Sequence, residues 1–202
     1  DWLRYGKYTM KETTSPLYFL LSDEIIRFEI EKDGQVVELE RENKSTILNT
    51  HVEKSGYQET MGGSVIRYDL FNIRNNSKVS LEDFYLHESL PVDAAYITRL
   101  FTGTFNQNRN YAIYYKTNKT NGFRILKDNL FTNKVYEIDC TKCLMAGEYI
   151  TDIKYMFGSV EPGFKEIERP FIYCKTYTNL PNGYRFTNRV EVGGMYEMQK
   201  VK

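Results

Sequence analysis

Residues 64–91, SVIRYDLFNIRNNSKVSLEDFYLHESLP, decide the fold of this chain. In the first part of the stretch, Ile66, Tyr68 and Leu70 alternate with charged neighbours, which is the period of a strand with one buried face. The turn-forming residues Asn-Asn-Ser follow at 75–77, and a second apolar pattern then runs up to a proline. The stretch therefore predicts two β-strands joined by a polar turn.

The same period of two recurs along most of the chain. Ile26, Phe28 and Ile30 alternate before a turn signal at Asp33-Gly34, and Asn121-Gly122 is a hairpin signal between two strand-like segments. The 17 tyrosines and 12 phenylalanines also favour strands over helices. Because no long 3.6-residue periodicity interrupts this pattern, we expect an all-β protein.

Composition excludes several classes of partner. The chain has 202 residues, of which 27 are basic and 27 acidic, with no block of like charge. This balance gives no electrostatic footprint for nucleic acid or for an anionic membrane. No apolar run approaches the ~20 residues that span a bilayer, so we expect no membrane contact by this fragment.

The sequence contains no clear catalytic or metal-binding motif. The two histidines, His51 and His87, lie near no recognisable nucleophile, and no histidine–carboxylate spacing is typical of a metal site. The sequence Cys140-Thr-Lys-Cys143 has the C-x-x-C form but lacks a second such pair for zinc and a βαβ context for redox chemistry. We therefore expect no enzyme, no cofactor and no bound metal.

The first 45 residues carry a series of ordered landmarks. These are Tyr5-Gly6-Lys7-Tyr8, Glu12-Thr13, Phe28-Glu29-Ile30, Asp33-Gly34 and Asn43. In this order they resemble the C-terminal half of the prealbumin-like repeats of Gram-positive surface proteins and pilins. The resemblance implies a partial prealbumin-like β-sandwich over residues 1–46.

Such repeats contain a lysine–asparagine isopeptide cross-link assisted by a glutamate. By resemblance, Glu12 would be the acid and Asn43 the acceptor. The lysine would lie upstream of Asp1, so we expect this half-domain to lack its first strands and its bond.

The rest of the chain, residues 47–202, resembles another family. Its segments DFYLHESLPVDA, TGTF, YYKTN, EYITDIKYMFGSVEPGF and LPNGYRFTNRVEVGG follow the order seen in cell-surface repeat modules of Firmicutes. Those modules share the immunoglobulin-like fold of collagen-adhesin A-region domains. The resemblance implies an immunoglobulin-like β-sandwich in an extracellular, cell-wall-anchored protein, with the anchor in parts of the parent protein that are not present here.

This second resemblance implies an intramolecular cross-link. Lys54 on the first strand, Glu88 before Leu-Pro and Asn188 on the last strand match the motif positions of an isopeptide triad. Burial would lower the pKa of the lysine and raise that of the glutamic acid, which gives a neutral nucleophile and a proton shuttle. The alternative is a solvated lysine, a surface carboxylate and an edge asparagine.

The resemblance also suggests a disulfide. Cysteines commonly occupy the positions of Cys140 and Cys174 in the related modules, and the bridge requires the two strands to be neighbours. It would close a loop of roughly 35 residues, worth on the order of 3 to 4 kcal/mol in the chain-entropy model. The alternatives are a Cys140–Cys143 bridge and three inert thiols.

Two functions are expected from the resemblance. The first is a structural or adhesive module of a stalk, with neighbouring repeats of the same surface protein as its partners. The alternative is a ligand-binding adhesin that recognises a host extracellular protein or glycan through exposed tyrosines and the Phe105–Asn110 loop. A contiguous exposed aromatic groove would favour the adhesin.

Overall fold

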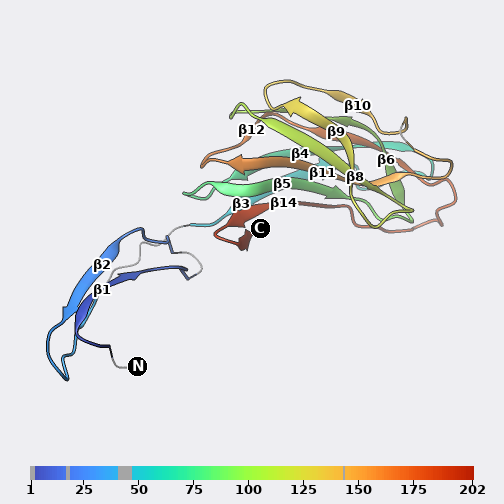
Figure 1. The fold of residues 1–202 in the computed structure, drawn as a ribbon. Helices are drawn as coiled ribbons and strands as arrows, with labels where there is room; N and C mark the ends of the chain where they lie inside the picture. Colours follow the sequence, from blue (N-terminus) through green and yellow to red (C-terminus); the bar gives the residue numbers. More distant parts are fainter. Residues whose placement is uncertain (1–2, 17–18, 41–46, 143) are drawn as a thin grey trace. The chain divides into compact units, whose positions relative to one another are not determined.

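The computed structural model describes residues 3–16, 19–40, 47–142 and 144–202. Its described residues form strands and turns and contain no helix, which confirms the all-β class (Figure 1). The chain divides into two compact units, residues 1–47 and residues 48–202, where the sequence suggested a boundary after residue 46.

The first unit contains one antiparallel strand pair, β1 (Gly6–Lys11) and β2 (Ile25–Ile30). Tyr8 lies opposite Phe28 in this pair, and the two rings stack with their centroids 5.5 Å apart. Among the described residues of this unit, no large apolar side chain is buried. A two-stranded sheet of this kind has little stability of its own, so the unit's apolar side chains lie in contact with solvent.

The second unit contains the remaining strands. They are β3 (Thr50–Gly56), β4 (Val65–Asn75), β5 (Leu81–Ser89), β6 (Ala95–Phe101), β7 (Thr104–Phe105), β8 (Asn110–Thr117), β9 (Arg124–Phe131), β10 (Glu137–Asp139), β11 (Ile150–Val160), β12 (Glu166–Glu168), β13 (Phe171–Thr176), β14 (Arg189–Tyr196) and β15 (Gln199–Val201).

The strand pairings define two layers. One layer has the order β3-β4-β13-β6-β10, and the other has the order β15-β14-β5-β11-β8-β9. The pair Ile97–Ile150 joins the layers where β6 meets the start of β11. β3 and β14 also lie side by side, and the Thr50 hydroxyl of β3 donates a hydrogen bond to the Val192 carbonyl of β14 at 3.1 Å (Figure 1). The second unit is thus a β-sandwich, as expected.

The stretch at residues 64–91 forms the two predicted strands, β4 and β5. They pair with different neighbours, so the turn between them carries the chain from one layer to the other. Asn75 fixes this turn, because its side chain accepts from the Ser77 N–H and donates to the carbonyls of Val79 and Glu161. The predicted hairpin at Asn121-Gly122 is also confirmed, since β8 and β9 pair antiparallel across it.

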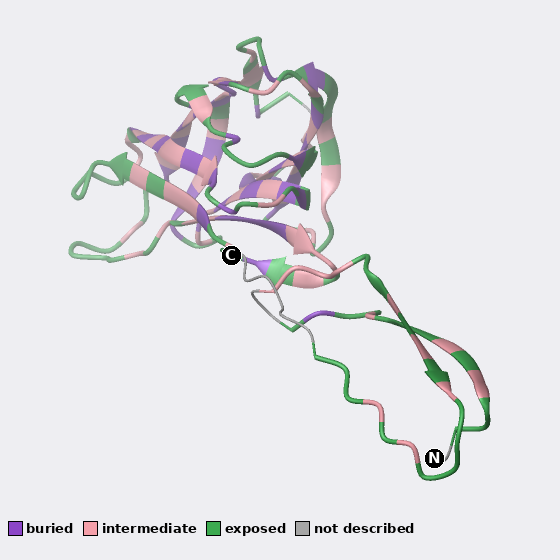
Figure 2. Cartoon of the chain, turned by 90° about the vertical axis from the view of Figure 1, so that its left-hand side faces the viewer, coloured by how far each residue is buried: buried purple, intermediate pink, exposed green. Residues whose placement is uncertain are grey.

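The core lies between the layers, where strand residues alternate between buried and half-exposed (Figure 2). As the alternation predicts, Ile66, Tyr68 and Leu70 are buried. A group of aromatic rings fills the centre, and its members pack with ring centroids 4.8–6.2 Å apart: Phe84, Phe105, Phe157 and Phe164. These rings are the largest apolar contribution to the sandwich.

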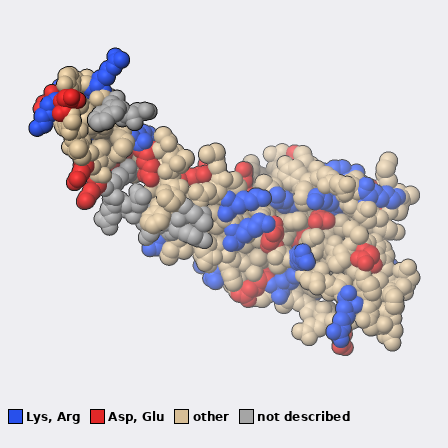
Figure 3. Space-filling model, turned by 90° about the horizontal axis from the view of Figure 1, so that it is seen from below, with Lys and Arg blue, Asp and Glu red and all other residues tan. Residues whose placement is uncertain are grey.

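Charged side chains are distributed over the surface. On the face drawn in Figure 3, acidic and basic groups are interspersed among uncharged ones. That face therefore offers no large area of one sign to a polyanion, in line with the balanced composition.

Replacement of the central ring tests this description of the core. We expect Phe84→Ala to lower the free energy of unfolding by about 3–5 kcal/mol, because the fully buried ring leaves a cavity against Phe157 and Phe164. Urea denaturation followed by circular dichroism measures the change. The control, Val92→Ala at a 56% exposed site, should change the free energy by less than about 0.5 kcal/mol. A similar small change for Phe84→Ala would contradict the assigned core.

Candidate functional site

A lysine and a glutamate meet between the two layers of the sandwich. Lys54 comes from β3 in one layer and Glu88 from β5 in the other. The Lys54 Nζ donates to both Glu88 oxygens, at 3.0 Å to Oε1 and 3.2 Å to Oε2. The Glu88 side chain is only 1% exposed and that of Lys54 13%, so the pair is almost removed from water.

Asn188 lies beside this pair. It immediately precedes β14, and in the pairing of β14 with β5 Val190 stands opposite Glu88. Lys54 and Asn188 line the same surface cavity of about 530 Å³. The three residues of the expected triad therefore gather at one place, where β3, β5 and β14 approach one another.

The amide group of Asn188 has an unusual environment. Its Nδ2 and Oδ1 are both buried, and neither completes a hydrogen bond of normal geometry. The amide is nevertheless near enough to Glu88 and Tyr68 to interact with both, and this interaction opposes the rise in pKa that burial causes in each group. A buried amide whose hydrogen bonds lack good geometry costs free energy, so this arrangement needs a functional or structural explanation.

Burial shifts both ionisable groups toward their neutral forms. It lowers the pKa of Lys54 from its usual value, although the Glu88 carboxylate partly opposes the shift. It likewise raises the pKa of Glu88, and here Lys54 and Asn188 act in the opposite direction. Burial therefore disfavours the charged forms of both groups, while each partner favours the charged form of the other.

Aromatic and sulfur groups border the pair. The Lys54 Nζ lies 5.6 Å from the centroid of the buried Tyr68 ring. Cys174 on β13 is also buried, and burial raises the pKa of its thiol well above the usual value, with Glu88 adding to the shift. Tyr68 and Phe84 are buried and Phe186 is partly buried.

The second predicted pair of site residues lies in the first unit. Glu12 follows β1, and its Oε2 accepts a hydrogen bond from the Ser22 N–H at 3.2 Å. Asn43, the expected acceptor, lies outside the described residues.

The disulfide expected between Cys140 and Cys174 is absent from the structure, because their strands are not neighbours. Cys140 follows β10 and Cys174 lies on β13, and β6 runs between these two strands. Strands one place removed are separated by about 9–10 Å, which exceeds the Cα distance that a disulfide allows. Both side chains are buried, and no disulfide joins them in the structure. Cys143, the rival partner, lies outside the described residues.

Sequence reasoning missed a histidine cluster at the edge of the same cavity. His87 Nε2 lies 2.9 Å from Asp152 Oδ1, and its Nδ1 lies 3.9 Å from Glu191 Oε1. His87 points away from the core because it precedes the inward-facing Glu88 on β5. Carboxylates thus face both ring nitrogens. Among the described residues, no group of histidine, cysteine and carboxylate side chains is arranged to hold a metal ion.

Comparison with known proteins identifies the first part of the chain. Residues 1–45 match the SpaA family model, a prealbumin-like fold domain. This match confirms the prealbumin-like interpretation of the N-terminal landmarks, and it supports a structural, pilin-type surface module. No curated protein and no solved structure matches the chain. In the part of the chain that the structure describes, no helix is long and apolar enough to cross a membrane.

The buried pair should show strong coupling between its members. We expect Lys54→Met/Glu88→Leu to be more stable than either single variant by about 2 kcal/mol or more, because each single change leaves one buried polar group without its partner. Urea denaturation of the three variants measures the difference. The control pair Arg99–Glu137, at 3.1 Å but about half exposed, should give a coupling below about 1 kcal/mol. Equal coupling in the two pairs would contradict the buried geometry.

The histidine cluster predicts that the stability of the second unit depends on pH in the acidic range. Burial raises the pKa of Asp152, but hydrogen bonds from His87, Thr151 and Ser89 outweigh it and hold the value below 3.8. A lowered carboxyl pKa contributes stability above the unfolded value, and this contribution is lost as the pH falls through the folded value. The stability advantage of the wild type over Asp152→Asn should therefore shrink as the pH falls below about 4, where this carboxylate takes up its proton.

Urea denaturation at each pH measures this advantage. The same substitution at the exposed Asp128 on β9 is the control. An advantage that is unchanged down to the lowest pH would show that Asp152 does not carry the proposed charge.

Proposed function

We propose that this chain is a structural module of a cell-wall-anchored surface protein of a Gram-positive bacterium, with an autocatalytic Lys54–Asn188 isopeptide bond in its second unit. The observation that carries the proposal is the convergence of Lys54, Glu88 and Asn188 at one place, where the Glu88 carboxylate and the Asn188 amide are buried. The match of residues 1–45 to a prealbumin-like domain supports a surface module independently.

The reaction is a condensation of an amine with an amide. The uncharged Lys54 Nζ attacks the Cγ of Asn188, forming a new C–N bond, and the original bond to Nδ2 breaks as ammonia leaves. The uncharged Glu88 donates a proton toward the amide, and its carboxylate then accepts the proton that the attacking nitrogen loses. Atoms and charges balance without an external reagent. The 3.0 Å contact between Lys54 and Glu88 suits this proton transfer.

The environment supports each step. Burial lowers the lysine pKa and thereby provides the nucleophile, and it raises the glutamic acid pKa and thereby provides the acid. Holding amine and amide in one dry site replaces an encounter in solution by an intramolecular reaction.

The bond would have a mechanical consequence. It would join β3, the first strand of the second unit, to the start of β14, its penultimate strand. Tension applied at the two ends of the unit would then pass through the covalent link, and the strands between Lys54 and Asn188 would remain folded. A stalk protein with neighbouring repeats of the same kind would gain resistance to force and to proteolysis.

Intact mass spectrometry tests the bond. We expect the folded chain to be lighter than its sequence mass by about 17 mass units, the ammonia lost in one condensation. Lys54→Arg, Glu88→Gln and Asn188→Ala should each show the full sequence mass, because they remove the nucleophile, the acid and the acceptor. Glu191→Gln changes another residue that lines the cavity and should keep the loss. A folded wild-type chain at its full sequence mass would refute the proposal.

A further inference from the structure

A cluster of three tyrosines lies at one end of the sandwich. Tyr96 is on β6, Tyr149 immediately precedes β11 and Tyr177 immediately follows β13. The Tyr96 ring packs 4.5 Å from Tyr149 and 5.5 Å from Tyr177, measured between ring centroids. In the described part of the chain, none of their hydroxyls makes a hydrogen bond. The cluster thus presents aromatic surface together with unused hydroxyl groups.

Two of these rings form the wall of a cavity of about 280 Å³. Residues 145–148, which precede Tyr149, also line the cavity, and Met145 among them is 78% exposed. The other lining residues are Ile97, Thr141 and Leu144. The volume lies just below the range usual for drug-sized ligands, so the cavity suits one small ring.

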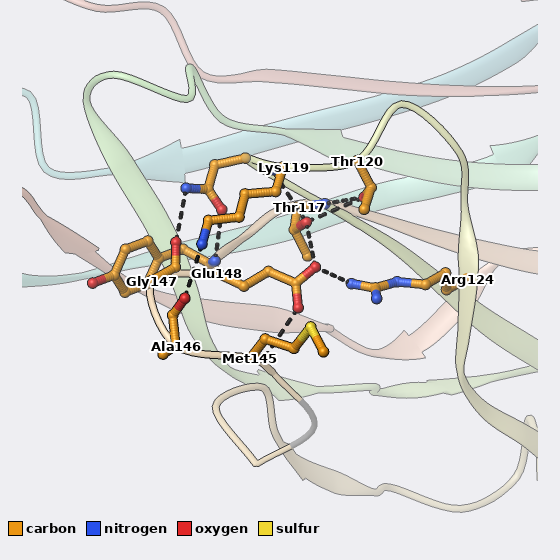
Figure 4. A network of polar contacts seen from close by, with 10 residues as sticks. Thr117, Lys119, Thr120, Arg124, Met145, Ala146, Gly147 and Glu148 are labelled. Carbon is orange, nitrogen blue, oxygen red and sulfur yellow. Dashed lines mark hydrogen bonds and ion pairs between the residues drawn. The ribbon is translucent and has the colours of Figure 1, made fainter.

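The cavity offers no unpaired charge to a ligand. Glu148 lines it, but the Glu148 carboxylate already accepts hydrogen bonds from the Thr117 hydroxyl, the Arg124 guanidinium and the Met145 N–H (Figure 4). The hydrogen bond from the Met145 N–H, followed by those from Thr117 and Arg124, holds the pKa of Glu148 below its usual value. The nearby Lys119 Nζ donates to the Ala146 carbonyl at 2.8 Å. A neutral ligand therefore fits better than an ion.

The same network fixes the aromatic wall. Asn118 and Tyr149 exchange two hydrogen bonds, from the Asn118 N–H to the Tyr149 carbonyl at 3.0 Å and from the Tyr149 N–H to Asn118 Oδ1 at 2.8 Å. Glu148, the neighbour of Tyr149, is itself held by Thr117 and Arg124. The main chain of Tyr149 is thus held in place, and its ring packs against Tyr96, so less conformational freedom is left to lose when a ligand binds.

We propose that this cavity binds one ring of a neutral carbohydrate. A pyranose has apolar C–H faces that pack on aromatic rings and hydroxyls that hydrogen-bond to free tyrosine hydroxyls. A proline-rich peptide would also pack on tyrosines, but it docks along a groove several residues long, whereas this cavity accommodates a single ring. The site is separate from Lys54 and Glu88, and it does not depend on the covalent bond.

Glycan binding by the full chain tests the proposal. The probe is an array of neutral oligosaccharides together with sialylated and sulfated forms of the same cores. We expect binding to neutral glycans, weakened about tenfold or more by Tyr149→Ala, which removes the aromatic wall. Tyr149→Phe should retain most of the binding, since it keeps the ring. Tyr114→Ala, at another tyrosine of the second unit, should bind as the wild type does.

A second variant covers the case in which Tyr149→Ala fails to fold. Met145→Glu changes an exposed lining residue and places a charge at the cavity, so it should fold normally and lose binding. The proposal is overturned if no neutral glycan binds, if charged glycans or proline-rich peptides are preferred, or if Met145→Glu binds as well as the wild type. The mass measurement on Lys54 is unaffected by any of these outcomes.

Discussion

The buried contact between Lys54 and Glu88 is the interaction on which the second unit depends, because it joins strands of different layers. Removing two charges from water costs several kcal/mol per ion, and a buried ion pair seldom repays this cost in stability. Here the cost is reduced because burial shifts both pKa values toward the neutral forms. An apolar pair of similar volume often stabilises a core equally well, so stability alone does not account for a lysine and a glutamate at this place.

Local patterns predicted the strands but not their order. Alternation at Ile66, Tyr68 and Leu70 identified the inward face correctly, because a strand's period is set by its own backbone. The order of strands depends on contacts between distant segments, and no local pattern reports it. β4 and β5 thus belong to different layers although they are consecutive, and β6 separates Cys140 from the Cys174 strand.

The candidate site likewise contains residues that the sequence predicted and residues that it did not. Motif resemblance selected Lys54, Glu88 and Asn188, which spacing alone did not distinguish from surface residues. The cluster of His87 with Asp152 was missed because its members are 65 positions apart and carry no motif. Glu148 was missed for the same reason, since its partners come from the β8–β9 hairpin. A buried carboxylate at the end of a strand can be predicted only when the turn that supplies its hydrogen-bond donors is known.

The two proposed properties of the second unit are connected through one segment of chain. Tyr177 begins the segment that leads to Asn188, and Tyr184 within it donates a hydrogen bond to Asp93 at 2.6 Å. A covalent bond at Asn188 would fix the far end of this segment, while the Tyr177 N–H bond to the Ala94 carbonyl fixes its start. Load on the chain would then leave the tyrosine cluster in place. A surface module that must hold a ligand under tension needs this separation of the load-bearing link from the binding surface.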